Sequence, residues 1–350
     1  MTPAHNIYIH VPFCISKCRY CAFYSAAIKP DWEKYTNDII TEINHWGDIL
    51  GRITVPTIFF GGGTPSLMPG WALSQIIDTV AARFDIENDA EITLESNPGT
   101  LDDGKITDVI ARGINRISIG VQSLNDAELQ FLGRRHNAAA ARDAIDAAMH
   151  AGARVSADFI YGLPGQTADT VATMCRDVNQ LGLSHCSMYE LTIEPGTPLA
   201  RANPNMPDNT TMAEMYDAIG QTLNLPRYEV SNYAAADAHC RHNENVWDGA
   251  PYIGIGRGAA GRIFVDGQWY EQRGAGAEFN PLSHSARAVE KVITGMRTMR
   301  GVAESPDIAA VLNTAWISAH PELVIRANGR IRTTPQGLII LDEILTNMVL

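Results

Sequence analysis

Three cysteines stand close together near the start of the chain, at Cys14, Cys18 and Cys21. Cysteine thiolates on tight local loops are the usual ligands of iron–sulfur clusters. Three thiolates can hold three irons of a cubane and leave the fourth iron open to an outside ligand. The alternatives are a redox pair and a zinc site, to which His10 could add a fourth ligand. The Cys-x3-Cys-x2-Cys spacing is not a usual zinc pattern, so it favours a [4Fe–4S] cluster.

The segments that must position these thiols alternate between strand and helix patterns. Strands are predicted at 7–11, 57–60, 92–95, 116–120, 155–160 and 186–191, and helices at 32–50, 71–84, 102–112, 138–151, 167–181 and 210–225. Such alternation indicates βαβ units and a parallel sheet, and we therefore predict an α/β fold. Six units suit an open, partial barrel better than a closed barrel of eight.

Polar and glycine-rich motifs follow each predicted strand, as in Gly61-Gly62-Gly63-Thr64. In barrel-like α/β folds the reacting groups gather at the carboxyl ends of the strands, so these motifs should form one rim. Glycines permit close approach of the backbone to a ligand, whereas a single glycine would more simply mark a tight turn.

The remainder of the chain has a weaker pattern. Residues 1–227 form the predicted core, 228–280 a connecting region rich in glycine and proline, and 281–350 a small helical domain. Within that domain helices are expected at 285–300 and 334–349, with a short hairpin or wing beginning at Gly329 between them.

Composition limits the class of protein. Hydrophobic residues make up 45% and charged residues 19%, as in an ordinary globular chain, and the net charge is −12. An acidic surface repels phosphate backbones, so nucleic acid is not expected as a partner. No segment is apolar over the roughly 20 residues that a membrane-spanning helix needs. Residues 1–10 lack the pattern of a signal peptide, so we expect a cytoplasmic protein.

The cysteine motif, with the aromatic Tyr20 before its last cysteine, resembles the signature of the radical-SAM enzymes. The segments 8–14, 59–65, 95–99, 120–123, 158–166 and 233–261 further resemble the coproporphyrinogen oxidase-like family, in order and over nearly the whole chain. This family contains oxygen-independent coproporphyrinogen III oxidases and heme chaperones. Phe23 stands where the oxidases carry a further cysteine, and the segment before Cys14 is short. Both features favour the heme chaperones.

The resemblance implies a partial radical-SAM barrel and assigns roles to individual residues. The three cysteines would hold the cluster, and S-adenosyl-L-methionine (SAM) would chelate its open iron. Positions that match contacts to SAM in the family are Tyr8, Tyr20, Gly62, Gly63, Thr64, Glu95, Gln122, Arg134 and Asp158. Among them, the glycine segment would take the amino group of SAM, the two carboxylates its ribose, and Arg134 its carboxylate. For Tyr20, ordinary core packing is the alternative.

A second motif, His242-Asn-Glu-Asn-Val246-Trp247, resembles the His-Asn-x-x-Tyr-Trp motif that heme chaperones carry. Imidazole is a normal axial ligand of heme iron, so His242 is a candidate ligand. Val246 replaces the tyrosine of the motif, and Ala260 stands where the family pattern has histidine. A structural, hydrogen-bonding histidine is the alternative. The resemblance implies heme or a porphyrin and apo-hemoproteins as partners, with porphyrinogen oxidation as the alternative function.

Overall fold

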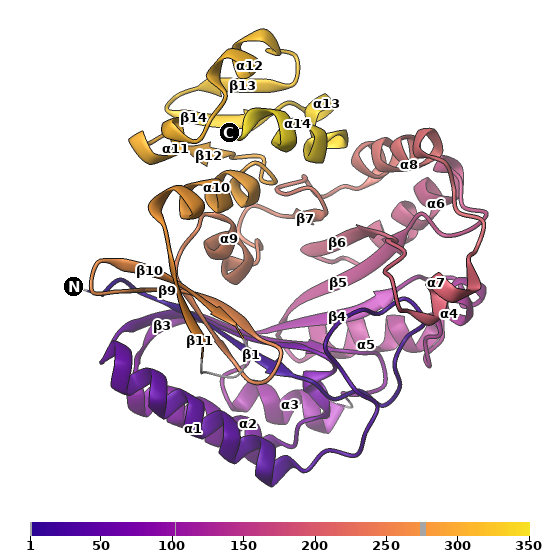
Figure 1. Ribbon diagram of the computed structural model, residues 1–350. Coiled ribbons are helices and arrows are strands. Elements are labelled where there is room, and N and C mark those ends of the chain that lie inside the picture. The colour runs from indigo at the N-terminus through magenta and orange to yellow at the C-terminus, as the bar shows by residue number, and fades with distance from the viewer. Residues whose placement is uncertain (1, 102, 274–277) are drawn as a thin grey trace.

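The computed structural model describes residues 2–101, 103–273 and 278–350, and its centre is an eleven-stranded sheet (Figure 1). Six strands follow one another across this sheet in chain order, and each pairs in parallel with the next: β1 (Asn6–Val11), β2 (Thr54–Gly62), β3 (Asp85–Ser96), β4 (Arg116–Gln122), β5 (Arg154–Tyr161) and β6 (His185–Glu190). The strand order does not close on itself, so the prediction of an open α/β barrel is confirmed.

Helices connect these strands in the expected positions. The long ones are α1 (Trp32–Leu50), α2 (Gly70–Arg83), α3 (Asp103–Ala111), α5 (Ala138–His150), α6 (Ala168–Asn179) and α8 (Asn209–Thr222), while η1 (Pro65–Leu67), α4 (Asp126–Leu132), α7 (Pro198–Ala202) and α9 (Arg241–Trp247) are short. The side chain of Asp31 accepts the N–H of Lys34 and so caps α1. Helices α1, α2, α3 and α5 lie on one side of the sheet (Figure 1). Asp102, the expected first residue of α3, is outside the described residues.

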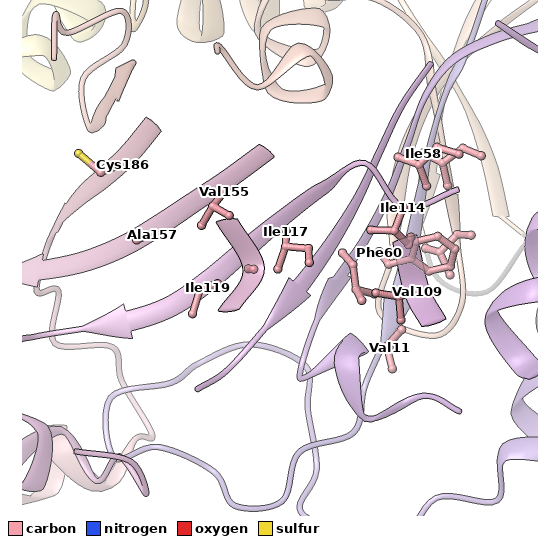
Figure 2. Packing of buried hydrophobic residues seen from close by; sticks show 14 of the residues in the cluster. Val11, Ile58, Phe60, Val109, Ile114, Ile117, Ile119, Val155, Ala157 and Cys186 are labelled. Carbon is pink, nitrogen blue, oxygen red and sulfur yellow. The ribbon is translucent and has the colours of Figure 1, made fainter. Parts of the chain in front are cut away.

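The two faces of the parallel strands differ in chemistry because successive side chains point to opposite sides. Figure 2 shows apolar residues from several strands, among them Ile117 and Ile119 of β4, packed in the buried cluster. Ser118 lies between these two in sequence and therefore faces the other side, where it lines two cavities. The sheet thus turns an apolar face to its helices and a polar face to the interior of the open barrel.

The region 228–280 contributes more to this sheet than its weak pattern indicated. It forms β7 (Asn232–Ala234), β8 (Tyr252–Ile255), β9 (Ala260–Val265) and β10 (Gln268–Arg273), and β11 (Glu278–Leu282) follows. Strand β8 pairs in parallel with β1, whereas β9, β10 and β11 continue that edge antiparallel. The proposed domain boundaries at residues 228 and 281 stay a prediction.

The C-terminal residues form a second hydrophobic cluster beside a three-stranded sheet. Its elements are α10 (His284–Gly295), β12 (Val302–Ala303), α11 (Pro306–Ala310), α12 (Thr314–Ala319), β13 (Val324–Ala327), β14 (Arg330–Thr333), α13 (Pro335–Ile339) and α14 (Leu341–Met348). The expected hairpin is present, with positive φ at Asn328 and Gly329 in its turn. The single helix expected at 334–349 is two helices. Within the described ranges, no helix has both the length and the apolar character to cross a bilayer.

Candidate functional site

The three cysteines open on one cavity of about 490 Å³ at the carboxyl ends of the strands. Two backbone hydrogen bonds hold their loop, because Cys14 N donates to Ala26 O at 3.0 Å and Arg19 N donates to Leu132 O at 3.1 Å. A cubane needs one thiolate for each of three irons, so the thiols do not have to converge on a single atom. No cluster of three metal-binding side chains suited to one ion occurs within residues 2–101, 103–273 and 278–350.

His10, the residue considered as a fourth zinc ligand, is engaged elsewhere. Its Nε2 lies 2.8 Å from the carbonyl oxygen of Tyr24, which can only accept, so this nitrogen carries the proton. Its Nδ1 is therefore the acceptor for the hydroxyl of Tyr8 at 3.0 Å. Burial lowers the pKa of His10. Both ring nitrogens of His10 are therefore used in hydrogen bonds. The ring holds the chain just after the cysteine loop, at Tyr24, and has no nitrogen left to coordinate a metal.

The glycine segment packs directly against the cysteine loop. A Cβ on Gly63 would lie 2.6 Å from Phe13 O and 3.0 Å from Cys14 Sγ, so any side chain here would displace that loop. The N–H groups of Gly63 and Thr64 donate to Val11 O and Phe13 O, each at 2.8 Å. Gly62 N donates to Glu95 Oε2 at 2.9 Å. Since all three N–H groups are bonded, the segment can offer a ligand carbonyl oxygens, which suit an ammonium group.

Arg134 brings a positive charge to the same cavity. Its Nη1 lies 3.3 Å from Cys18 Sγ, and its Nη2 donates to Gly120 O at 2.5 Å and to the side chain of Asn97. The thiol of Cys18 therefore has a cation as its direct neighbour. Three thiols on one cavity with a cation at one of them fit an iron–sulfur cluster. Tyr20 lines this cavity as well. Its side chain packs against a group of buried apolar residues that includes Leu132.

Two carboxylates face the cavity from neighbouring parts of the sheet, Glu95 on β3 and Asp158 on β5. Burial, together with the charge of Asp158, raises the pKa of Glu95 to about 7. Burial also raises the pKa of Asp158, although hydroxyls of Ser187 and Ser118 oppose the shift, Ser118 Oγ at 3.1 Å from Oδ2. Carboxylates in this position can accept hydrogen bonds from a ligand's hydroxyl groups.

Gln122 ends β4 in an unusual conformation. Its φ is 71°, in the left-handed region that residues other than glycine seldom occupy, and the pairing of β4 with β5 shifts register between Gly120 and Gln122. Such strain and such bulges concentrate at functional sites, where they aim a side chain. Gln122 lines the cavity of the three cysteines.

A second cavity of about 410 Å³ lies beside the first, inside the open barrel. Four residues line both cavities and form a shared wall: Glu95, Ser118, Asp158 and Tyr189. Tyr8, expected near SAM, lines this second cavity, where its ring stacks on Phe59 with centroids 6.1 Å apart. Its expected contact with SAM stays a prediction.

His242 lies in the second cavity on α9, buried against β2. Its Nδ1 is 2.7 Å from Thr57 Oγ1, and Thr57 Oγ1 donates to Asn6 Oδ1 at 2.8 Å. The side-chain amide of Asn6 is fixed because its Nδ2 donates to Pro251 O at 3.0 Å. The hydroxyl proton of Thr57 is used in the bond to Asn6. In the bond between Thr57 and His242, Nδ1 must therefore be the donor and Thr57 Oγ1 the acceptor.

This network leaves His242 Nε2 with a lone pair. Burial lowers the pKa of His242 to about 3, so the ring is neutral at physiological pH. Within the part of the chain that the structure describes, Nε2 has no hydrogen-bond partner. A neutral imidazole held through Nδ1–H and open at Nε2 is the arrangement that metal-ligating histidines adopt. The alternative of a purely structural histidine accounts for Nδ1 but not for Nε2.

The two departures from the family patterns, Val246 in the heme motif and Ala260 further along the chain, meet in this cavity. Val246 and Ala260 both line the cavity of His242, although they come from α9 and β9. Short side chains at both positions leave space in the cavity that His242 lines. Cys240 also lines the cavity, but burial raises its thiol pKa to about 12 and its Sγ donates to Glu91 Oε1 at 3.5 Å.

Sequence reasoning missed several residues of these cavities. No motif marked Thr93, Arg116 or the wall residues Ser118 and Tyr189. A signal was present in the alternation itself: Thr93 and Ser118 occupy the polar positions between apolar residues of β3 and β4. Alternation alone does not say which polar residues share a cavity, since that depends on register between strands.

Comparison with known proteins identifies the family of this chain. The model of the Radical SAM superfamily matches residues 8–178. The heme chaperone HemW of Escherichia coli (strain K12) is 38% identical over 273 residues, covering 76% of this chain and 72% of that protein. HemW of Mycobacterium tuberculosis (strain ATCC 25618 / H37Rv) is 33% identical over 360 residues, covering 93% and 92%.

Among solved structures, coproporphyrinogen III oxidase (HemN) from Escherichia coli superposes with a TM-score of 0.81 at 19% identity, covering 99% of this chain and 89% of that one. This likeness extends the shared fold over nearly all of the chain. The chain belongs to the radical SAM superfamily, in the coproporphyrinogen oxidase-like family and close to its HemW members.

Proposed function

We propose that this protein is a heme chaperone, which binds heme at His242 and passes it to apo-hemoproteins. The observation that carries the proposal is that His242 lines a cavity while Thr57 and Asn6 hold its Nδ1, which leaves the Nε2 lone pair without a partner among the described residues. The two HemW relatives are heme chaperones. A cytoplasmic location and recipient hemoproteins belong to the same proposal.

Membership of the radical SAM superfamily implies a [4Fe–4S] cluster and SAM. We propose that Cys14, Cys18 and Cys21 hold the cluster and that SAM occupies the rest of the same cavity. The residues that would contact SAM there are Tyr20, Gly62, Gly63, Thr64, Glu95, Gln122, Arg134 and Asp158. The cluster would supply electron transfer to SAM. The chain itself would contribute carbonyl oxygens for the SAM amino group, carboxylates for the ribose hydroxyls and a guanidinium for the SAM carboxylate.

The experiment is a hemin titration of the anaerobically reconstituted protein, followed by its Soret absorbance, with His242→Ala beside it. We expect a saturable shift in the wild type and its loss in the variant. His185→Gln is the matched control: His185 is buried and lines the same cavity, but its nitrogens face Ser156 Oγ and, at 2.8 Å, Tyr228 Oη. Hemin binding that survives His242→Ala, or that fails in the wild type, contradicts the proposal.

The shared wall between the cavities supports a second candidate, a coproporphyrinogen oxidase-like enzyme. A substrate beside His242 would lie next to the SAM site, separated by Glu95, Ser118, Asp158 and Tyr189. Incubation with coproporphyrinogen III, SAM and a reductant tests it. Formation of 5′-deoxyadenosine together with a decarboxylated porphyrinogen would support the enzyme, and SAM cleavage without such a product would reject it.

A further inference from the structure

Arg116 lines the His242 cavity, and one N–H group of its guanidinium has no partner in the described part of the chain. We call the part of the cavity that Arg116 and Thr93 line its floor. The side chain of Arg116 is 2% exposed, and it lines the cavity from the first residue of β4. Nη1 donates to Ala238 O at 3.0 Å and to His239 O at 3.2 Å. Nη2 is fully buried and has no hydrogen-bond partner in the described ranges of the chain. A buried guanidinium N–H without an acceptor is costly, so a ligand oxygen that accepted from it would stabilise the site.

A second unused donor lies beside the first. Thr93 is the register partner of Arg116 across β3 and β4, so both side chains point to the same face of the sheet. Thr93 Oγ1 is also buried without a partner in the residues that the structure describes, and Thr93 lines the same cavity. Two neighbouring N–H and O–H donors match the two oxygens of one carboxylate.

The charged side chains near Arg116 and Thr93 decide whether an anion can bind at this floor. Glu91 Oε2 lies 3.6 Å from Arg116 Nη1 and 3.7 Å from Arg154 Nη1, so two arginines face this one carboxylate, and the charge of Arg116 also acts on Asp158. The carboxylates of Glu95 and Asp158 lie further along their strands; Glu95 follows Thr93 by two residues, roughly 7 Å. Of the other titratable groups that line the cavity, His185, His242 and Cys240 are neutral because burial disfavours their charged forms.

This floor is close to the proposed iron ligand. Glu91 Oε1 accepts the backbone N–H of His242 at 3.0 Å, while its other oxygen faces Arg116. One carboxylate therefore spans the gap between the α9 backbone at His242 and the guanidinium. We propose that Arg116 and Thr93 form a carboxylate-binding site for an acidic side chain of the tetrapyrrole that binds at His242. This inference rests on the proposed function, and it adds that the cavity selects macrocycles with free carboxylates.

The test compares hemin with its dimethyl ester, which lacks free carboxylates, in the same neutral detergent. We expect the wild type to bind hemin roughly tenfold or more tightly than the ester, as a charged hydrogen bond provides. Arg116→Met should abolish this preference. Because Arg116 Nη1 also holds the carbonyls of Ala238 and His239, that variant could fold poorly, and Thr93→Val is the second variant.

Thr93→Val keeps the shape of the side chain and removes a buried, unpartnered hydroxyl. We expect it to raise the melting temperature of the ligand-free protein, while it weakens hemin binding several-fold and leaves ester binding unchanged. Thr36→Val is the matched control, because Thr36 Oγ1 on α1 is likewise buried and unpartnered in the described residues and Thr36 lines no cavity of this site. It should raise stability without affecting hemin.

The outcomes separate the two ideas. If His242→Ala abolishes hemin binding while Arg116→Met and Thr93→Val leave the preference intact, the carboxylate site is wrong and the proposed function stands. If the preference depends on Arg116 and Thr93 but not on His242, the carboxylate site is supported and iron ligation by His242 is rejected. If the wild type binds neither macrocycle, the proposed function and this site are both overturned.

Discussion

Gly62 N donates to Glu95 Oε2 at 2.9 Å, so the glycine segment of β2 and a carboxylate of β3 meet at the wall between the two cavities. The bond fixes the carboxylate beneath the segment that we assign to SAM. It also stabilises the charged form of Glu95, although burial and the charge of Asp158 prevail and raise its pKa to about 7.

Stability should therefore depend on pH through Glu95. The folded chain binds the proton more tightly than the unfolded chain, where the carboxyl has its ordinary pKa of 4.5. The free energy of unfolding should thus fall as pH rises from about 4.5 to about 7, by at most about 3 kcal/mol from this group. Denaturant titrations of wild type and Glu95→Gln across this range measure the difference. A variant with the same pH slope as the wild type would contradict the assignment.

The tautomer of His242 should depend on Thr57. Thr57→Val removes the acceptor for Nδ1–H, so the ring loses the bond that keeps the proton on Nδ1 and the lone pair on Nε2. Because loss of such an outer partner typically weakens metal binding 10–100-fold, we expect hemin affinity to fall by about tenfold. Thr57→Ser keeps the hydroxyl and should retain most of the affinity. Equal affinities of the valine and serine variants would show that the hydroxyl does not orient the ring.

Cluster assembly should depend on the absence of a side chain at Gly63. Gly63→Ala would bring Cβ to 2.6 Å from Phe13 O and 3.0 Å from Cys14 Sγ, and the cysteine loop would have to move. We expect a clear loss of iron and acid-labile sulfide after anaerobic reconstitution. Gly220→Ala is the control, since on α8 the added carbon would meet the flexible Arg227 side chain, at 3.2 Å from Nη2. Full cluster content in Gly63→Ala would show that the contact is not required.

The space beside His242 should govern heme affinity. Val246 lines the same cavity, and the resembling motif has tyrosine at this position. Val246→Tyr adds a ring and a hydroxyl that can donate to a bound ligand, so we expect tighter hemin binding, by severalfold. Val246→Phe separates the two contributions, because it adds the ring alone. Weaker binding in both variants would show that the cavity needs its present volume.

The strands and helices of residues 6–225 were largely predictable, because their order follows from local patterns. The helix expected at 32–50 is α1 with the same bounds, since apolar residues at helical spacing such as Ile39 and Ile43 face the core. The region 228–280 was not predictable in this way. Strand β8 has four residues, and its partner β1 lies some 245 positions away, so only tertiary packing selects it.

The sequence by itself determined the cysteine motif, the alternating α/β pattern and the family resemblance, because these depend on residue types at short, fixed spacing. Tertiary structure alone decided that Thr57, Asn6 and His242 form one hydrogen-bonded chain. It also decided that Thr93 and Arg116 lie side by side with unused donors, and that Val246 and Ala260 open the same cavity. These relationships depend on strand register and on the packing of α9 against β2, which join residues far apart in the chain.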